Sequence, residues 1–159
     1  MTKRKKQRKK EQRTLFHPAH LHQLPVRLAA GAFILNSGLS KHNASEELSS
    51  GVHGMASGAY PPFKRMRPEQ FVKLLSTSEI LLGVALLTPV VPSLLAGAGL
   101  AAFSAGLVGL YLRTPGMRQE GSLRPTQSGI ALAKDVWLLG IGVSLVAEEA
   151  REIVPGSRG

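Results

Sequence analysis

One stretch of 33 residues, from Ile80 to Leu112, contains no charged side chain. A helix needs about 20 apolar residues to cross the hydrocarbon core of a bilayer, so this stretch is too long for one span and nearly long enough for two. Pro89 and Pro92 interrupt it, and each removes a backbone donor and disfavours helix in the residue before it. The pattern therefore predicts a hairpin of two membrane-spanning helices, over residues 70–88 and 93–112.

Two apolar segments with a weaker membrane-span signal flank this hairpin. The first runs from Leu24 to Ser40, and the last runs from Gly129 to Ala147. The first is short for a span and would have to tilt or thin the bilayer locally, whereas the last is long enough. We expect an all-α membrane protein, an antiparallel bundle of four transmembrane helices. The bundle would occupy residues 24–147, between a disordered basic tail (1–23) and a short polar C-terminal tail (148–159).

The amino-terminal tail holds eight of the chain's 20 basic residues. By the positive-inside rule the tail lies in the cytoplasm, and four spans return the C-terminus to the same side. The tail is interpreted as an orienting segment, and binding of anionic lipid headgroups is the alternative role. Nucleic acid is a poor fit, because no aromatic residue lies within the basic run to stack on bases. The candidate headgroup-binding residues are Lys3, Arg4, Lys5, Lys6, Arg8, Lys9 and Lys10.

Ionisable residues inside the apolar segments are the candidates for function. Such groups are expensive in a membrane and usually face the bundle interior or a cavity. Glu79 is the clearest case. We expect Lys134 to be its partner, with Lys41 as the alternative. Arg27 lies at the opposite face of the membrane, farther in depth from Glu79 than Lys134 is. The pair could serve only helix packing, or it could form a proton or ligand site. The full candidate set is Arg27, Lys41, Glu79, Lys134 and Asp135.

Small residues recur every fourth position in the third apolar segment. Gly97, Ala101, Ala105 and Gly109 form one smooth helix face. In lipid, helices associate through close packing of such faces. We expect packing within the same bundle, and homodimer formation through this stripe is the alternative.

The remaining composition narrows the chemistry. The chain has no cysteine, which excludes disulfides, thiolate metal sites and cysteine nucleophiles. His17, His20 and His22 are close in sequence, but we favour an interfacial polar segment over a metal site and expect no metal. The glycine- and proline-rich segment 41–70 and the segment 113–128 are expected to be irregular external loops. No set of residues suited to an autonomous hydrolase or transferase stands out.

The order of these motifs resembles the DoxX family of membrane proteins. The similarity rests on Arg27-Leu-Ala-Ala-Gly31 in the first segment, Glu79-Ile-Leu-Leu-Gly83 in the second and Lys134-Asp135-Val-Trp in the fourth, and it covers residues 24–147. It implies a four-helix protein of the prokaryotic inner membrane with both termini cytoplasmic. Family members are linked to thiosulfate:quinone oxidoreductase and other membrane redox complexes. The resemblance carries over no catalytic residues.

Two functions follow as hypotheses. The first is a non-catalytic subunit that anchors or assembles a redox complex in the bilayer, with a protein of that complex as partner and no intrinsic cofactor. The second is a membrane protein that handles a proton, a small molecule or a quinone through the buried carboxylate of Glu79. The catalytic residues, the substrate and the oligomeric state are not encoded in any motif that we identify.

Overall fold

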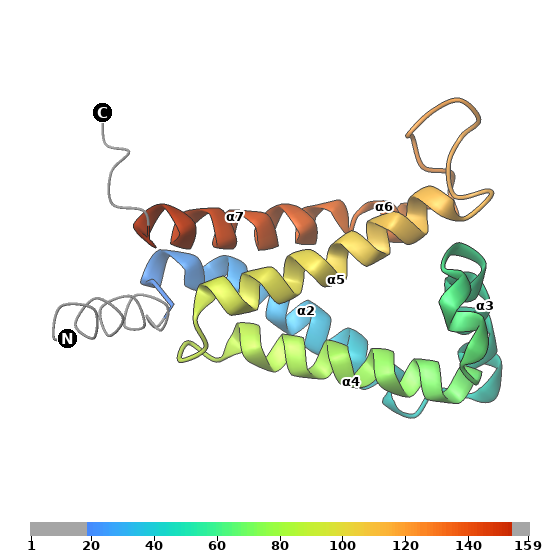
Figure 1. The fold of residues 1–159 in the computed structure, drawn as a ribbon, viewed down its shortest axis with the longest axis horizontal. Coiled ribbons are helices and arrows are strands. Elements are labelled where there is room, and N and C mark those ends of the chain that lie inside the picture. Colours follow the sequence, from blue (N-terminus) through green and yellow to red (C-terminus); the bar gives the residue numbers. More distant parts are fainter. Residues whose placement is uncertain (1–18, 154–159) are drawn as a thin grey trace, which may run out of the picture.

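The computed structural model describes residues 19–153, whose regular elements are helices (Figure 1). The predicted hairpin is confirmed, because helices occupy 68–87 and 93–113 on either side of Pro89 and Pro92. Four long helices, α2, α4, α5 and α7, lie lengthwise beside one another. In chain order the elements are η1 (Leu21–Gln23), α2 (Leu24–His42), α3 (Glu46–Ala59), η2 (Pro61–Arg65), α4 (Pro68–Leu87), α5 (Ser93–Arg113), α6 (Ile130–Ala133) and α7 (Val136–Ile153).

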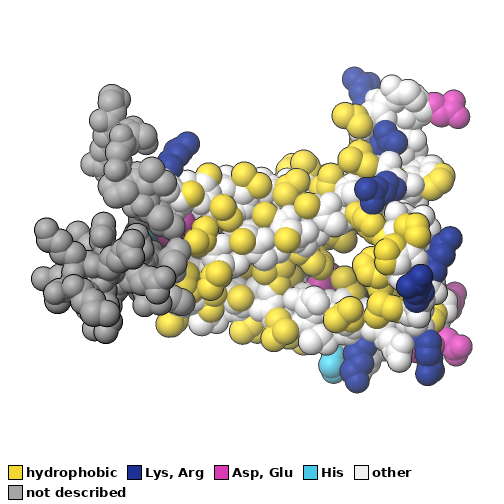
Figure 2. Space-filling view, in the orientation of Figure 1, with side chains coloured by type: hydrophobic (Ala, Val, Ile, Leu, Met, Phe, Trp, Pro, Cys, Tyr) yellow, Lys and Arg dark blue, Asp and Glu magenta, His cyan; other side chains and the backbone are white. Residues whose placement is uncertain are grey.

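Three helical segments are long and apolar enough to cross a membrane: Pro68–Leu87, Ser93–Arg113 and Ile130–Arg151. Large apolar side chains on them point outward, including Leu81 (65% exposed) and Trp137 (75% exposed). Hydrophobic side chains dominate the flanks of these helices in Figure 2, whereas Lys and Arg side chains gather at the end that carries α3. Exposure of so many apolar side chains is unfavourable in water and favourable in the hydrocarbon core of a bilayer. The chain is therefore a multi-pass membrane protein.

Helix α2 packs along α4 through glycines. A Cβ atom added to Gly83 of α4 would lie 2.7 Å from the Cβ and backbone nitrogen of Leu35, and one added to Gly38 of α2 would lie 2.9 Å from the Cβ of Glu79. Such distances are shorter than any ordinary contact between heavy atoms, so the two backbones approach closely only because these positions lack side chains.

Helix α5 packs along α7 in the same way. A Cβ atom on Gly97 would lie 2.7 Å from that of Leu145, and one on Gly142 would lie 2.5 Å from the backbone nitrogen of Ala101. The first half of the predicted small-residue stripe therefore serves packing within the chain. Its second half does not join this contact, because Ala105 is exposed and Gly109 lies beside the Tyr60 hydroxyl.

An apolar core joins the two helix pairs. Ile34 of α2, Leu86 of α4, Leu100 of α5 and Leu145 of α7 are each at most 2% exposed and belong to one cluster. Because lipid is as apolar as these side chains, their contribution in a bilayer comes from close van der Waals contact.

The segment 41–70 is not the irregular loop that its glycines and prolines predict. Helix α3 begins after Ser45, whose hydroxyl accepts a hydrogen bond from the Leu48 backbone at 3.3 Å, and two glutamates occupy its first turn. It lies across one end of the long helices (Figure 1), where Ala56 packs against Phe71 and Val72 of α4. The N-cap and this apolar contact outweigh the low helix propensity of glycine.

Two predicted boundaries also change. Helix α7 extends to Ile153, so the C-terminal tail does not begin at 148. Residues 21–23 form η1 rather than part of a disordered tail, and residues 1–18 lie outside the described part of the chain. The predicted loop 113–128 is confirmed in position, since no helix lies between Arg113 and Ile130, and Gly116 and Gly121 take positive φ angles there.

Candidate functional site

Glu79 lies in the middle of α4 and is 4% exposed. The ammonium group of Lys41, in the last turn of α2, lies 3.0 Å from each of its carboxylate oxygens. The Ser37 hydroxyl donates a further hydrogen bond to Oε1 of Glu79 at 3.1 Å. Two donors and one full counter-charge thus satisfy this carboxylate, as a buried charge requires.

The expected contact between Glu79 and Lys134 is wrong, and Lys41 takes that place. The reason is the reach of a lysine side chain. Lys41 sits near the end of its helix, yet its ammonium group extends back one turn and also donates to the backbone oxygen of Ser37 at 3.1 Å. The Lys134 ammonium group lies instead over the ring of Phe33, 5.1 Å from the ring centroid.

The α2–α4 contact is also close at the level of this ion pair. Gly38 faces Glu79 with no side chain between them, and the Ser76 hydroxyl donates to the backbone oxygen of Gly38 at 2.8 Å. Ser76 is 0% exposed. The polar groups here are therefore held by two helices that cannot separate without breaking buried hydrogen bonds.

Asp135 is the second buried carboxylate, with 7% of its surface exposed. It lies in the two-residue interruption between α6 and α7, where the sequence predicts one continuous helix. Its side chain forms no hydrogen bond or ion pair within residues 19–151. The charged groups that act on it electrostatically are Lys134, Glu79 and Lys41, so the two carboxylates share one polar region.

Arg27 is a further buried charge, and it lies away from Glu79. Its guanidinium group is 0% exposed and donates five hydrogen bonds at the far end of α4. Four go to backbone oxygens at the end of α4 and in the proline turn, where helical donors run out. The Thr88 oxygen also accepts from the Val91 backbone nitrogen at 3.0 Å. The fifth goes to the Ser93 hydroxyl at 2.8 Å. Arg27 therefore caps α4 and fixes the α4–α5 turn. The four carbonyl acceptors are those of Ala85, Leu86, Thr88 and Val91.

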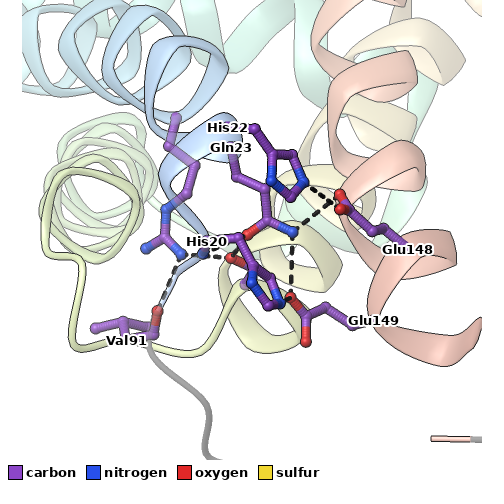
Figure 3. Close-up of polar contacts among 8 residues, drawn as sticks. His20, His22, Gln23, Val91, Glu148 and Glu149 are labelled. Carbon is purple, nitrogen blue, oxygen red and sulfur yellow. Dashed lines mark hydrogen bonds and ion pairs between the residues drawn. The ribbon is translucent and has the colours of Figure 1, made fainter. Parts of the chain in front are cut away.

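A polar network extends from this turn to the end of α7 (Figure 3). The Ser93 hydroxyl donates to Gln23, and the Gln23 amide donates to Glu148 at 2.9 Å and to Glu149 at 3.2 Å. His22 is hydrogen-bonded to Glu148, and His20 lies 3.9 Å from Glu149. These contacts tie the start of α2 to the end of α7.

Sequence reasoning missed this network, although one signal pointed to it. A turn with two prolines leaves several carbonyl oxygens unpaired, and a buried arginine is the side chain with the most donors to offer them. The histidines predicted as a polar segment take part in the network through His20 and His22, and His17 lies outside the described residues. Within residues 19–151 no group of three or more potential ligands is arranged to hold a metal ion.

The proposed headgroup-binding residues of the tail also lie outside the described part of the chain. Comparison with models of known protein families, with curated proteins and with solved structures gave no match to this chain. The resemblance to the DoxX family stays a prediction that rests on the quoted motifs.

Proposed function

We propose that all four long helices cross the bilayer as an antiparallel bundle in a prokaryotic inner membrane, with both termini in the cytoplasm. The basic tail supports this orientation through the positive-inside rule, because it brings the basic residues on the cytoplasmic side to ten, against eight at the α3 end. The close glycine contacts of α2 with α4 support a spanning α2, because they continue from Gly31 to Gly38 along the helix. Its 19 residues are nearly the length that a bilayer requires.

We propose that the bundle handles a proton or a small polar molecule, a quinone included, at the region that Lys41, Glu79 and Asp135 share. One observation carries this proposal: Asp135 is buried in a membrane-capable segment without a hydrogen-bond partner among the described residues. A buried carboxylate that served only helix packing would be expected to have a counter-charge within the protein, as Glu79 has in Lys41. A buried carboxylate that has no partner within the protein is suited to bind one and release it.

The test uses the purified protein in sealed vesicles. Glu79→Gln and Asp135→Asn should each lower proton flux or quinone-dependent electron transfer by at least tenfold while the protein still inserts and purifies. Glu120→Gln, a matched change at an exposed loop carboxylate, should leave both activities unchanged. Equal activity in all four proteins would reject the proposal.

A second function, a subunit that anchors or assembles a redox complex, is favoured by a separate surface. Ala98, Ala102 and Gly106 of α5 are exposed and follow one another at every fourth position. They leave a smooth helix face that is open at Ala98 and Ala102 and is bounded at Gly106 by the Tyr60 hydroxyl, which donates to the Gly106 backbone oxygen at 2.8 Å. A transmembrane helix of a partner packs closely onto such a face. A second copy of this chain is the alternative occupant of the same face.

Affinity purification from the native membrane in mild detergent tests this role. A redox enzyme should co-purify in stoichiometric amount with the natural chain and be lost with Ala102→Phe, whereas Leu81→Phe, at an exposed apolar position of α4, should retain it. Recovery of the chain alone, from both variants and from the natural sequence, would reject the anchor role. A dimer disrupted by Ala102→Phe would identify a second copy as the occupant.

A further inference from the structure

The charges around Asp135 do not balance through direct contacts. Lys41 is committed to Glu79, with its ammonium group 3.0 Å from both oxygens of that carboxylate. Lys134, the nearest cation in sequence, is an exposed residue with its ammonium group over the Phe33 ring. Asp135 therefore lacks a contacting counter-charge within the described residues although it is more than nine-tenths buried. An unpaired carboxylate in such a place is strongly unfavourable and recruits a positive charge.

The backbone around Asp135 is also irregular. Helix α6 ends at Ala133 and α7 begins at Val136, and the Asp135 and Trp137 amides bond three residues back, to Leu132 and Lys134. Helices broken inside a membrane segment commonly supply ion-binding groups, because their loosened turns expose polar atoms to a bound charge. The break thus falls on the residue whose charge is unbalanced.

The Asp135 carboxylate is not fully enclosed. No carboxylate atom of Asp135 is among the fully enclosed polar atoms without a partner, so its oxygens keep some accessible surface. The carboxylate oxygens are therefore partly open to a small ion.

We propose that Asp135 holds one monovalent positive charge, either a proton on its carboxyl group or an alkali cation beside it. This inference rests on the proposed function of the polar region and names its ligand class. A single charge is the amount that is missing, because Lys41 already neutralises Glu79. A divalent ion would leave one charge in excess, and an anion would add to the charge that burial already disfavours.

The chain offers an unusually clean test, because Asp135 is its only aspartate. Protein produced by cell-free synthesis, with aspartate labelled by carbon-13 at the side-chain carboxyl, reports on this residue alone, without any substitution. Infrared spectra of the purified protein at neutral pH, in a buffer whose only cation is choline, should show an isotope-shifted carboxylic-acid band. That band marks a proton as the bound charge under these conditions.

Sodium chloride and potassium chloride then distinguish the two sources of charge. If an alkali ion is the ligand, either salt should remove the band in a saturable manner and shift the labelled carboxyl resonance, while choline chloride at equal ionic strength should not. If the proton is the ligand, the band should persist in all three salts. A carboxylate signal in choline buffer that no salt alters would overturn the proposal.

Lys134 provides the internal control, because it is the cation that could balance Asp135 from a distance. Lys134→Gln should leave the labelled signal unchanged; a switch of Asp135 from carboxylate to carboxylic acid in this variant would assign the counter-charge to Lys134 and overturn the proposal. The vesicle assay separates this inference from the function. A bound charge without flux or electron transfer rejects only the function, and an ionised, salt-insensitive Asp135 in an active protein rejects only the inference.

Discussion

Replacing Arg27 by methionine removes the donor of five hydrogen bonds from the end of α4. Two of these bonds are fully buried, to the Leu86 carbonyl and to the Ser93 hydroxyl. A buried acceptor left without a donor costs about 1 to 3 kcal/mol, so these two give about 2 to 6 kcal/mol. Methionine avoids the cost of burying a guanidinium group, which offsets part of this loss. We expect Arg27→Met to lower the free energy of unfolding by about 2 to 4 kcal/mol.

Equilibrium unfolding in mixed detergent micelles, followed by helical circular dichroism, measures this change. Arg27→Lys should show an intermediate loss, because an ammonium group keeps the charge but lacks the fork of donors that reaches several carbonyls. Arg65→Met, at an exposed position of η2, controls for the loss of a positive charge. If Arg27→Met unfolds at the same detergent concentration as Arg65→Met, the role assigned to Arg27 as the cap of α4 is refuted.

The same unfolding assay tests two further contacts. Lys41→Met should destabilise the protein by about 3 to 5 kcal/mol, because it leaves the Glu79 carboxylate buried without its cation, and adding Glu79→Gln should restore most of that loss. Recovery of less than half would show that Lys41 acts mainly through packing. Gly142→Ala should cost about 1 to 3 kcal/mol, because the new Cβ would meet the Ala101 backbone. Gly140→Ala, with open space around it, should stabilise α7 by about 0.5 to 1 kcal/mol, and a similar gain at Gly142 would contradict the α5–α7 contact.

The long helices could be located from sequence because their signals are local. An uncharged stretch and two prolines place α4 and α5 to within two residues, since chain length and missing backbone donors act on the nearest turn. Helix α3 could not be found in this way. Its glycines suggest a loop, and the contact of Ala56 with α4 that stabilises it joins residues distant in sequence.

The polar sites, too, could be predicted only in part. Their residue types were identifiable, because charges within apolar segments are rare enough to be noticed. Their pairing was not, because the partner of Glu79 depends on how far a lysine side chain reaches from the neighbouring helix and on the register that Gly38 allows. The break that isolates Asp135 likewise depends on tertiary packing, since the surrounding sequence is apolar and suited to an unbroken helix.

The central claim is that the bundle crosses the membrane with its α3 end and its proline turn on opposite sides. Because the chain has no cysteine, single substitutions by cysteine can be labelled with a membrane-impermeant maleimide on intact cells. Glu47→Cys and Glu120→Cys at the α3 end should react from outside, and Val90→Cys in the turn only after the membrane is opened. Reaction of all three from the same side would contradict a membrane-spanning bundle and, with it, the placement of the two carboxylates inside the bilayer.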